Sequence, residues 1–293
     1  MHRETSQPNN IPKEIKSYLE GMPSLSTTMS KVLAICNNPL ASANDLNRII
    51  ALDPVLTGKV LRLINSAYYS YGEPISSLTR AIIILGMNTV KNLALCSAVM
   101  DNLCRHEKMS AKIMNDFWMH SLSTGVTAKI LAIQKGVPPT EREEYFVAGL
   151  LHDLGKIPLM SLYMDQYRKL LYAHEDNGRY LLHEREEATF GMGHCHIGTL
   201  IAEKWRLSTQ ITVAMRDHHM STPARNKADF FPSIVAAANM ISHCLYPQTS
   251  AFVPKDIIDS YIELAGIDVE AIPAMAGLVD QELEKAKIFL ELT

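Results

Sequence analysis

The stretch Glu144-Tyr-Phe-Val-Ala-Gly-Leu-Leu-His152-Asp153-Leu-Gly-Lys156 decides the fold, because it ends a strongly apolar helix with an adjacent His-Asp pair. An ionised Asp153 in such surroundings is costly without a partner, and a divalent cation is a natural partner. Imidazole nitrogen and carboxylate oxygen suit Zn, Mn, Fe or Ni. The competing interpretation is that Asp153 caps the next turn and His152 packs in the core. For an isolated His-Asp dipeptide, that second interpretation is the more frequent outcome.

Helical signals dominate on both sides of this stretch, and strand signals are nearly absent. Ser42 precedes a helix with one apolar face, and Asp53-Pro54 combines an N-cap with proline at the first helical position. Ser77 opens another helix, which Gly86 ends. The apolar spacing predicts further helices over about 88–103, 113–134, 141–153, 195–205, 208–219 and 230–245, with a less defined set between 159 and 182. The predicted fold class is all-α.

Composition predicts a globular protein with a sizeable core. The chain has 293 residues, of which 47% are hydrophobic and 20% are charged. We predict a flexible tail over 1–11, an N-terminal helical part over 12–108 and a second helical domain over 109–293, because the polar stretch 105–112 separates two apolar regions. No signal peptide or membrane span is expected. The five cysteines form no CxxC pair, which favours a reducing, cytoplasmic location and excludes a zinc ribbon.

The N-terminal part contains a weak helix-turn-helix pattern, Ala81…Gly86…Val90. Glycine ends many helical hairpins, so the pattern has little specificity. Only Lys91 lies near the second helix, and the net charge of the chain is −3. The sequence therefore does not favour nucleic acid as a partner.

Further histidines follow in the second half of the chain, each on or next to a predicted helix. They are His120, His194, His196, His218 and His219. Any one of them, taken alone, is more often a structural residue than a ligand. Together with the His-Asp pair they make four short segments that can supply metal ligands.

The order of these segments resembles the HD superfamily of metal-dependent phosphohydrolases, and especially the order in HD-GYP domains. The N-terminal half is similar to the rest of the HDOD module. The motifs behind the resemblance are Pro23-x-Leu, Asp53-Pro54-x-Leu, Leu63-Ile-Asn65-Ser66-Ala67, Ala81-Ile-x-x-Leu85-Gly86, His152-Asp153-x-Gly-Lys156, His194-x-x-x-Gly198, Trp205-x-Leu207 and His218-His219. They cover about residues 12–250. The resemblance implies an N-terminal helical subdomain packed on an HD-like helical bundle.

The resemblance also implies a centre with one or two divalent ions, of Fe, Mn, Zn or Ni. Its ligands would be the imidazoles and one carboxylate of the shared motifs, namely His120, His152, Asp153, His194, His218 and His219. Asp153 would bridge the ions if two bind, and Lys156 would contact phosphate or water as the candidate catalytic residue. His196 would pack in the core, or contact a metal ligand rather than the metal itself.

Two departures from the family pattern bear on activity. The closing acidic ligand is expected in the helix that contains Asn239, and asparagine is a poorer, neutral ligand. No Gly-Tyr-Pro segment follows His219, where the sequence is Met-Ser-Thr-Pro-Ala-Arg. Cleavage of cyclic di-GMP is therefore not expected.

Three functions stay open at this point. The first is a regulatory signalling protein that keeps a metal centre, with other signalling proteins or a small phosphorylated ligand as partners. The second is an active metal-dependent phosphohydrolase that acts on a nucleotide or another phosphoester. The third is a metal-free interaction scaffold. The C-terminal stretch 255–293 is expected to form helices that either close the domain or mediate dimerisation.

Overall fold

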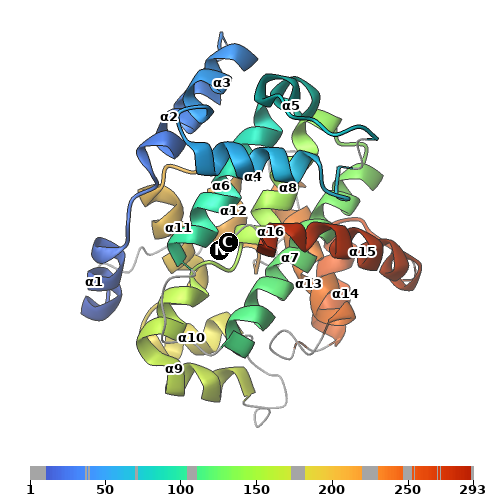
Figure 1. The fold of residues 1–293 in the computed structure, drawn as a ribbon. Coiled ribbons are helices and arrows are strands. Elements are labelled where there is room, and N and C mark those ends of the chain that lie inside the picture. Colours follow the sequence, from blue (N-terminus) through green and yellow to red (C-terminus); the bar gives the residue numbers. More distant parts are fainter. Residues whose placement is uncertain are drawn as a thin grey trace.

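The chain folds into helices, and the all-α prediction is confirmed (Figure 1). The computed structural model describes residues 11–36, 38, 40–69, 72–103, 111–172, 182–219, 230–246, 253, 255–268, 270 and 272–291. Within these ranges there is no β-strand. The predicted tail before Ile11, most of the polar connector 105–112 and the segment that follows His219 lie outside the described residues.

The N-terminal half contains six helices whose starts follow from local capping chemistry. They are α1 (Lys13–Gly21), α2 (Thr27–Cys36), α3 (Ala43–Ile50), α4 (Pro54–Ile64), α5 (Leu78–Leu85) and α6 (Met87–Leu103). Ser42 and Asp45 form a capping box at α3. Asp53 accepts a hydrogen bond of 2.9 Å from the Leu56 amide at the start of α4. Gly86 takes a positive φ of 79° between α5 and α6, so α6 begins at residue 87 rather than 88 or 89.

The second half starts with α7 (Ala111–Gln134) and α8 (Pro139–Leu151), which form its central helix pair. The helices that follow are α9 (Lys156–Tyr172), α10 (Leu182–Phe190), α11 (His194–Lys204), α12 (Thr209–Asp217), α13 (Phe230–Leu245), α14 (Lys255–Leu264), α15 (Ile272–Ala286) and α16 (Ile288–Glu291). The poorly defined set predicted over 159–182 includes α9, which has a non-helical residue at Tyr163. Helix α14 packs on α13 and α15 packs on α7, so the C-terminal helices cover the second half.

Glycines allow unusually close packing beside the candidate site. A Cβ added to Gly149 in α8 would lie 2.7 Å from the Cα of Gly125 in α7. A Cβ added to Gly155 would lie 1.9 Å from the carbonyl oxygen of His194. Because these positions carry no side chain, α8 approaches α7 directly, and the turn after α8 approaches α11 directly.

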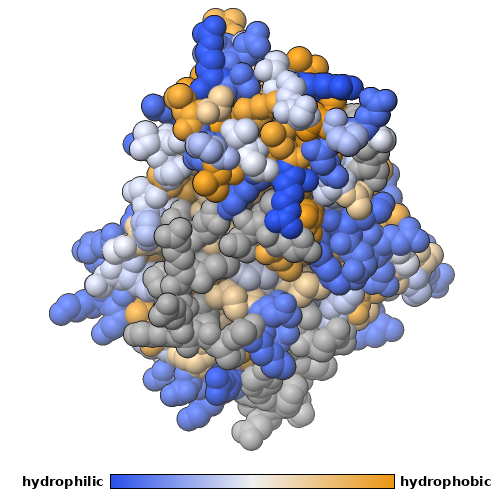
Figure 2. All heavy atoms as spheres, viewed as in Figure 1, coloured by the Kyte–Doolittle hydropathy of each residue, from blue (hydrophilic) through white to orange (hydrophobic). Residues whose placement is uncertain are grey.

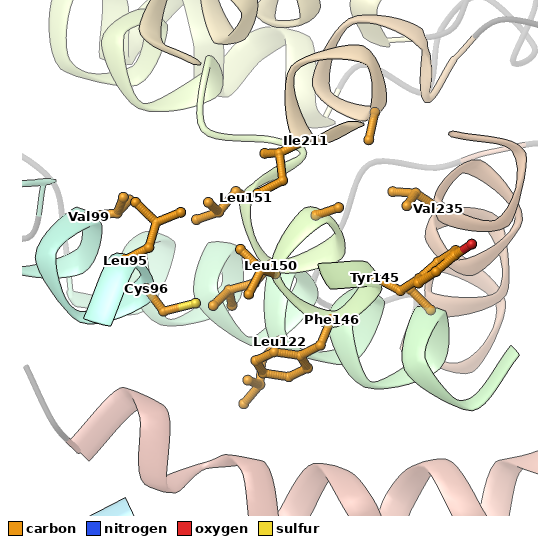
Figure 3. Packing of buried hydrophobic residues seen from close by; sticks show 14 of the residues in the cluster. Leu95, Cys96, Val99, Leu122, Tyr145, Phe146, Leu150, Leu151, Ile211 and Val235 are labelled. Carbon is orange, nitrogen blue, oxygen red and sulfur yellow. The ribbon is translucent and has the colours of Figure 1, made fainter. Parts of the chain in front are cut away.

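One continuous hydrophobic core joins the two halves. Leu95 and Val99 of α6 lie beside Leu150 and Leu151 of α8 in this core (Figure 3). On the face of the molecule drawn in Figure 2, apolar residues are most evident over the N-terminal helices. No single helix in the described ranges is long and apolar enough to cross a membrane. The pair Leu78–Leu85 and Met87–Met100, bent by 109°, meets those criteria of length and composition only when taken together.

Candidate metal centre

Asp153 is the centre of the candidate site. It is the second residue after α8, next to the C-cap His152, and has no exposed surface. Its two carboxylate oxygens face two different sets of imidazoles. Oδ2 lies 3.5 Å from Nε2 of His120 and 3.3 Å from Nε2 of His152. Oδ1 lies 3.2 Å from Nε2 of His194 and 3.5 Å from Nε2 of His218.

Hydrogen bonds on the outer side of three rings orient these Nε2 atoms. Nδ1 of His152 lies 2.6 Å from the Gly149 carbonyl oxygen. Nδ1 of His218 lies 3.0 Å from the Met215 carbonyl oxygen. A carbonyl oxygen can only accept, so each Nδ1 carries the proton and donates it. In the neutral ring, each Nε2 then presents a lone pair toward Asp153.

His194 is held in the same manner by a carboxylate. Oε2 of Glu186 lies 2.5 Å from Nδ1 of His194 and accepts a 2.8 Å hydrogen bond from its backbone amide. The Tyr167 hydroxyl donates to Oε1 of Glu186 at 2.5 Å. All three residues are fully buried. A carboxylate behind an imidazole fixes the tautomer and raises the basicity of the opposite nitrogen, as it does behind metal-bound histidines.

The converging lone pairs require a positive charge between them. Nε2 of His194 lies 3.2 Å from Nε2 of His218. In the neutral rings both atoms would be acceptors, because the hydrogen bonds to Glu186 and to the Met215 carbonyl oxygen hold the protons on Nδ1. Burial lowers the pKa of both rings, but Cys195 and Glu186 raise that of His194 to about 10. Cys195 and a hydrogen bond to Asp153 raise the pKa of His218 to about 9. The site thus attracts cations, either protons or a metal ion.

Two further histidines have ring nitrogens that lack hydrogen-bond partners within the described part of the chain. These are both nitrogens of His120 and both nitrogens of His219. Burial lowers the pKa of both rings well below the usual value, so they stay neutral. A neutral imidazole with a buried, unpartnered nitrogen is well suited to bind a metal ion.

The six predicted ligands, together with Cys195, fall into two groups. The first contains His120, His152 and Asp153, and the second contains His194, Cys195, His218 and His219. Within each group, one donor atom per residue lies within 4.8 Å of every other. This donor set of imidazoles, carboxylate and thiol fits a divalent cation such as zinc, iron or nickel. His196 is partly exposed and belongs to neither group.

Lys156 lies at the centre itself rather than beside it. Its ammonium group is 2.5 Å from Oδ2 of Asp153, and the residue is only 9% exposed. Burial raises the pKa of Asp153, but His152 and Lys156 lower it well below the usual value. Asp153 is therefore ionised, as metal binding requires.

Several residues of the site escaped prediction from the sequence. Cys195 contributes a thiol, and burial raises its pKa while His194 and His218 lower it to about 6. Glu186 is the carboxylate behind His194. The ring of His183 stacks on that of His219, with centroids 4.5 Å apart. Of these residues, only Cys195 could have been suspected from the sequence, because it directly follows the candidate ligand His194.

Helix α13 carries the position at which an acidic ligand was expected. Asn239 is 1% exposed, and its Oδ1 has no hydrogen-bond partner among the described residues. His243 lies one helical turn further on, with its ring centroid 4.7 Å from that of His120. Helix α13 thus brings an imidazole to His120, which the sequence did not predict.

The helical fold and the buried His-Asp constellation place the protein in the HD-like class that the motifs predicted. The family model of the HDOD domain matches residues 22–221, and the chain belongs to this family. The matched range is narrower than the 12–250 expected from the motifs.

Solved structures share this fold. A candidate phosphohydrolase from Shewanella amazonensis SB2B superposes with a TM-score of 0.71 and 21% identity, covering 95% of this chain and 98% of that one. An HDOD domain protein of unknown function from Geobacter sulfurreducens gives 0.72 and 22%, with 94% and 97% covered. A candidate signal transduction protein from Marinobacter aquaeolei VT8 gives 0.73 and 19%, with 97% and 62% covered. These similarities concern the fold.

A sequence relative comes from Treponema pallidum (strain Nichols), where it is described as an uncharacterized protein. It is 25% identical over 257 residues, which cover 87% of this chain and 49% of the relative. The chain thus spans about half the length of that relative.

Proposed function

We propose that this HDOD protein is a cytoplasmic regulatory component of signalling whose second half holds a divalent metal centre. The observation that carries the proposal is the carboxylate of Asp153, which is fully buried and presents each oxygen to a separate pair of imidazoles. Such an arrangement brings many hydrogen-bond acceptors to one buried point, and burial of unpaired acceptors costs free energy. A bound cation offsets that cost. The cytoplasmic location is supported by cysteine usage, since the described cysteines are all free.

The residues that would hold the metal fall into the two groups around Asp153. His120, His152 and Oδ2 of Asp153 would form one position. His194, His218 and His219 would form the other, together with Oδ1 of Asp153. When bound, a divalent ion supplies a fixed positive charge and Lewis acidity. Glu186 would keep the His194 ring oriented toward it.

Three features favour regulation over turnover. The ammonium group of Lys156 is paired with Asp153, so it is not directed at a phosphate. The ligands His152, Asp153, His194 and His218 have no exposed surface. The position of the expected closing carboxylate is occupied by Asn239. A centre whose main ligands are buried suits a structural or sensing role, with other signalling proteins as the partners.

The metal centre is tested by elemental analysis of protein purified without chelator. We expect metal in the wild type and its loss in Asp153→Asn, which keeps the shape of the side chain but removes its charge. Asp165→Asn, an exposed position on α9, is the matched control and should keep its metal. A metal-free wild type would refute the proposal and leave the interaction scaffold as the function.

The second candidate function is an active metal-dependent phosphohydrolase. It is favoured by the donor set of the centre, because a divalent ion held by imidazoles and a carboxylate can activate a water molecule for hydrolysis. Hydrolysis of a generic phosphodiester should be measured after addition of Mn or Fe. Turnover that disappears in His152→Ala would replace regulation by catalysis. We expect no such turnover.

A further inference from the structure

Cys195 lies where a thiol can complete the second half of the candidate centre. It is the second residue of α11, directly after His194. Its Sγ lies 4.0 Å from Nε2 of His218. The donor atoms of Cys195, His194, His218 and His219 all lie within 4.8 Å of one another.

These separations are close to those of a coordination sphere. Metal–nitrogen and metal–sulfur distances of about 2.0–2.3 Å in a tetrahedral site place neighbouring ligand atoms about 3.3–3.6 Å apart. The distance between Nε2 of His194 and Nε2 of His218 is 3.2 Å, and that between Nε2 of His218 and Sγ of Cys195 is 4.0 Å. Shifts of a few tenths of an ångström would place the three atoms around one ion.

A second observation points to an ion at the same place. Oδ1 of Asp153 is fully buried and has no hydrogen-bond partner among the described residues. It faces the same two imidazoles, at 3.2 Å from His194 and 3.5 Å from His218. A carboxylate oxygen, two imidazole nitrogens and a thiol sulfur therefore converge, and the single proton of the thiol can satisfy only one of the other atoms.

We infer that Cys195 is a thiolate ligand of the ion held on the Oδ1 side of Asp153. The inference rests on the proposed metal centre and specifies its chemistry. The thiol loses its proton to solvent when the sulfur binds the ion. Since the position formed by His120, His152 and Oδ2 lacks sulfur, the two halves of the centre differ in the metals that they prefer.

The consequence is a centre that selects thiophilic metals in one half. Thiolate favours zinc, cobalt and cadmium, whereas manganese and magnesium prefer oxygen ligands. A metal-dependent protein with only imidazole and carboxylate ligands would accept manganese more readily. Cys195 thus determines which class of cation binds, rather than whether a cation binds.

The inference is tested by loading the metal-free protein with Co²⁺ and recording its absorption spectrum. We expect a near-ultraviolet charge-transfer band from thiolate to cobalt in the wild type, and its loss in Cys195→Ser while cobalt stays bound. Cys244→Ser, at an exposed free cysteine, is the matched control and should keep the band. Bound cobalt without the band in the wild type, or a band that persists in Cys195→Ser, would overturn the inference alone. Failure of the wild type to bind cobalt would overturn the metal centre as well.

A competition experiment gives a second reading that does not depend on a spectrum. With equal zinc and manganese offered, the preference for zinc should be about tenfold or more lower in Cys195→Ser than in the wild type. Mutation of residues that contact only the ligands already costs about 10–100-fold in metal affinity. The melting temperature of each variant shows whether it is folded. An unchanged preference in a folded Cys195→Ser protein would also overturn the inference.

Discussion

The ammonium group of Lys156 and the Oδ2 oxygen of Asp153 are 2.5 Å apart, and the same oxygen faces Nε2 of His120 and of His152. One carboxylate oxygen therefore serves a lysine and two imidazoles. A metal ion bound by these imidazoles has to share that oxygen with the lysine or displace it. The structure thus makes Lys156 a competitor of the ion at this position.

Replacement of Lys156 by methionine should strengthen metal binding on the His120 side. The variant keeps most of the side-chain length but removes the charge next to Oδ2. We expect more metal bound per chain, or a lower dissociation constant, by isothermal titration with Zn²⁺. Lys112→Met is the control, because the lysine side chain is 77% exposed and pairs with Asp116, which belongs to neither ligand group. Weaker metal binding in Lys156→Met would contradict the competition.

Replacement of Glu186 by glutamine should weaken the other half of the centre. The change keeps the size of the residue but removes the negative charge that accepts from Nδ1 of His194. Loss of such an outer partner typically costs about 10–100-fold in metal affinity. Tyr167→Phe, which removes only the hydroxyl bonded to Glu186, should have a smaller effect. Equal losses in both variants would show that the carboxylate charge is not what matters.

Replacement of Gly149 by alanine should destabilise the fold, although glycine-to-alanine changes in helices usually stabilise. The new Cβ would lie 2.7 Å from the Cα of Gly125, and the backbone of α7 would have to move. We expect a loss of about 2–3 kcal/mol in the free energy of unfolding, the cost of overpacking. Gly58→Ala, where nothing lies within 4 Å, should instead gain about 0.4–1 kcal/mol. Urea denaturation measures both, and a stable Gly149→Ala protein would refute the close contact.

Replacement of Lys204 by methionine should loosen the first helix. At the end of α11, its ammonium group donates to the carbonyl oxygen of Met22 at 2.8 Å and to that of Leu19, near the end of α1. Lysine bonded to terminal carbonyls stabilises a helix end. Without these hydrogen bonds, the stability of α1 against local opening should fall by about 1 kcal/mol. Hydrogen exchange in α1 should then be roughly fivefold faster. Lys16→Met, which breaks only an exposed ion pair within α1, should leave exchange nearly unchanged.

The helices were predictable because their starts depend on residues that are neighbours in the chain. Ser42, Asp53 and Ser77 each accept a hydrogen bond from an amide three residues later, and such bonds need no tertiary structure. The interruption of α9 at Tyr163 was not predictable, since the surrounding residues keep a helical pattern. A break of that kind depends on packing between helices.

The site was only partly predictable for a similar reason. The pair His152-Asp153 stands out locally, and resemblance to a family supplied the other histidines. Glu186 and His243 reach the centre from α10 and α13, where nothing in the nearby sequence distinguishes them. Their roles arise from how the helices cross, and a single sequence does not contain that information in readable form.

The donor atoms of the centre come from segments spread between His120 and His219, and His152, Asp153, His194 and His218 are sealed from solvent. All three residues of the His120 side are buried, whereas Cys195 and His219 on the other side are partly exposed. Release of an ion from the His120 side should therefore require the helices to separate, and its lifetime there should follow the opening rate of the native protein. The rate of metal release from that side would then report the rate at which this domain unfolds.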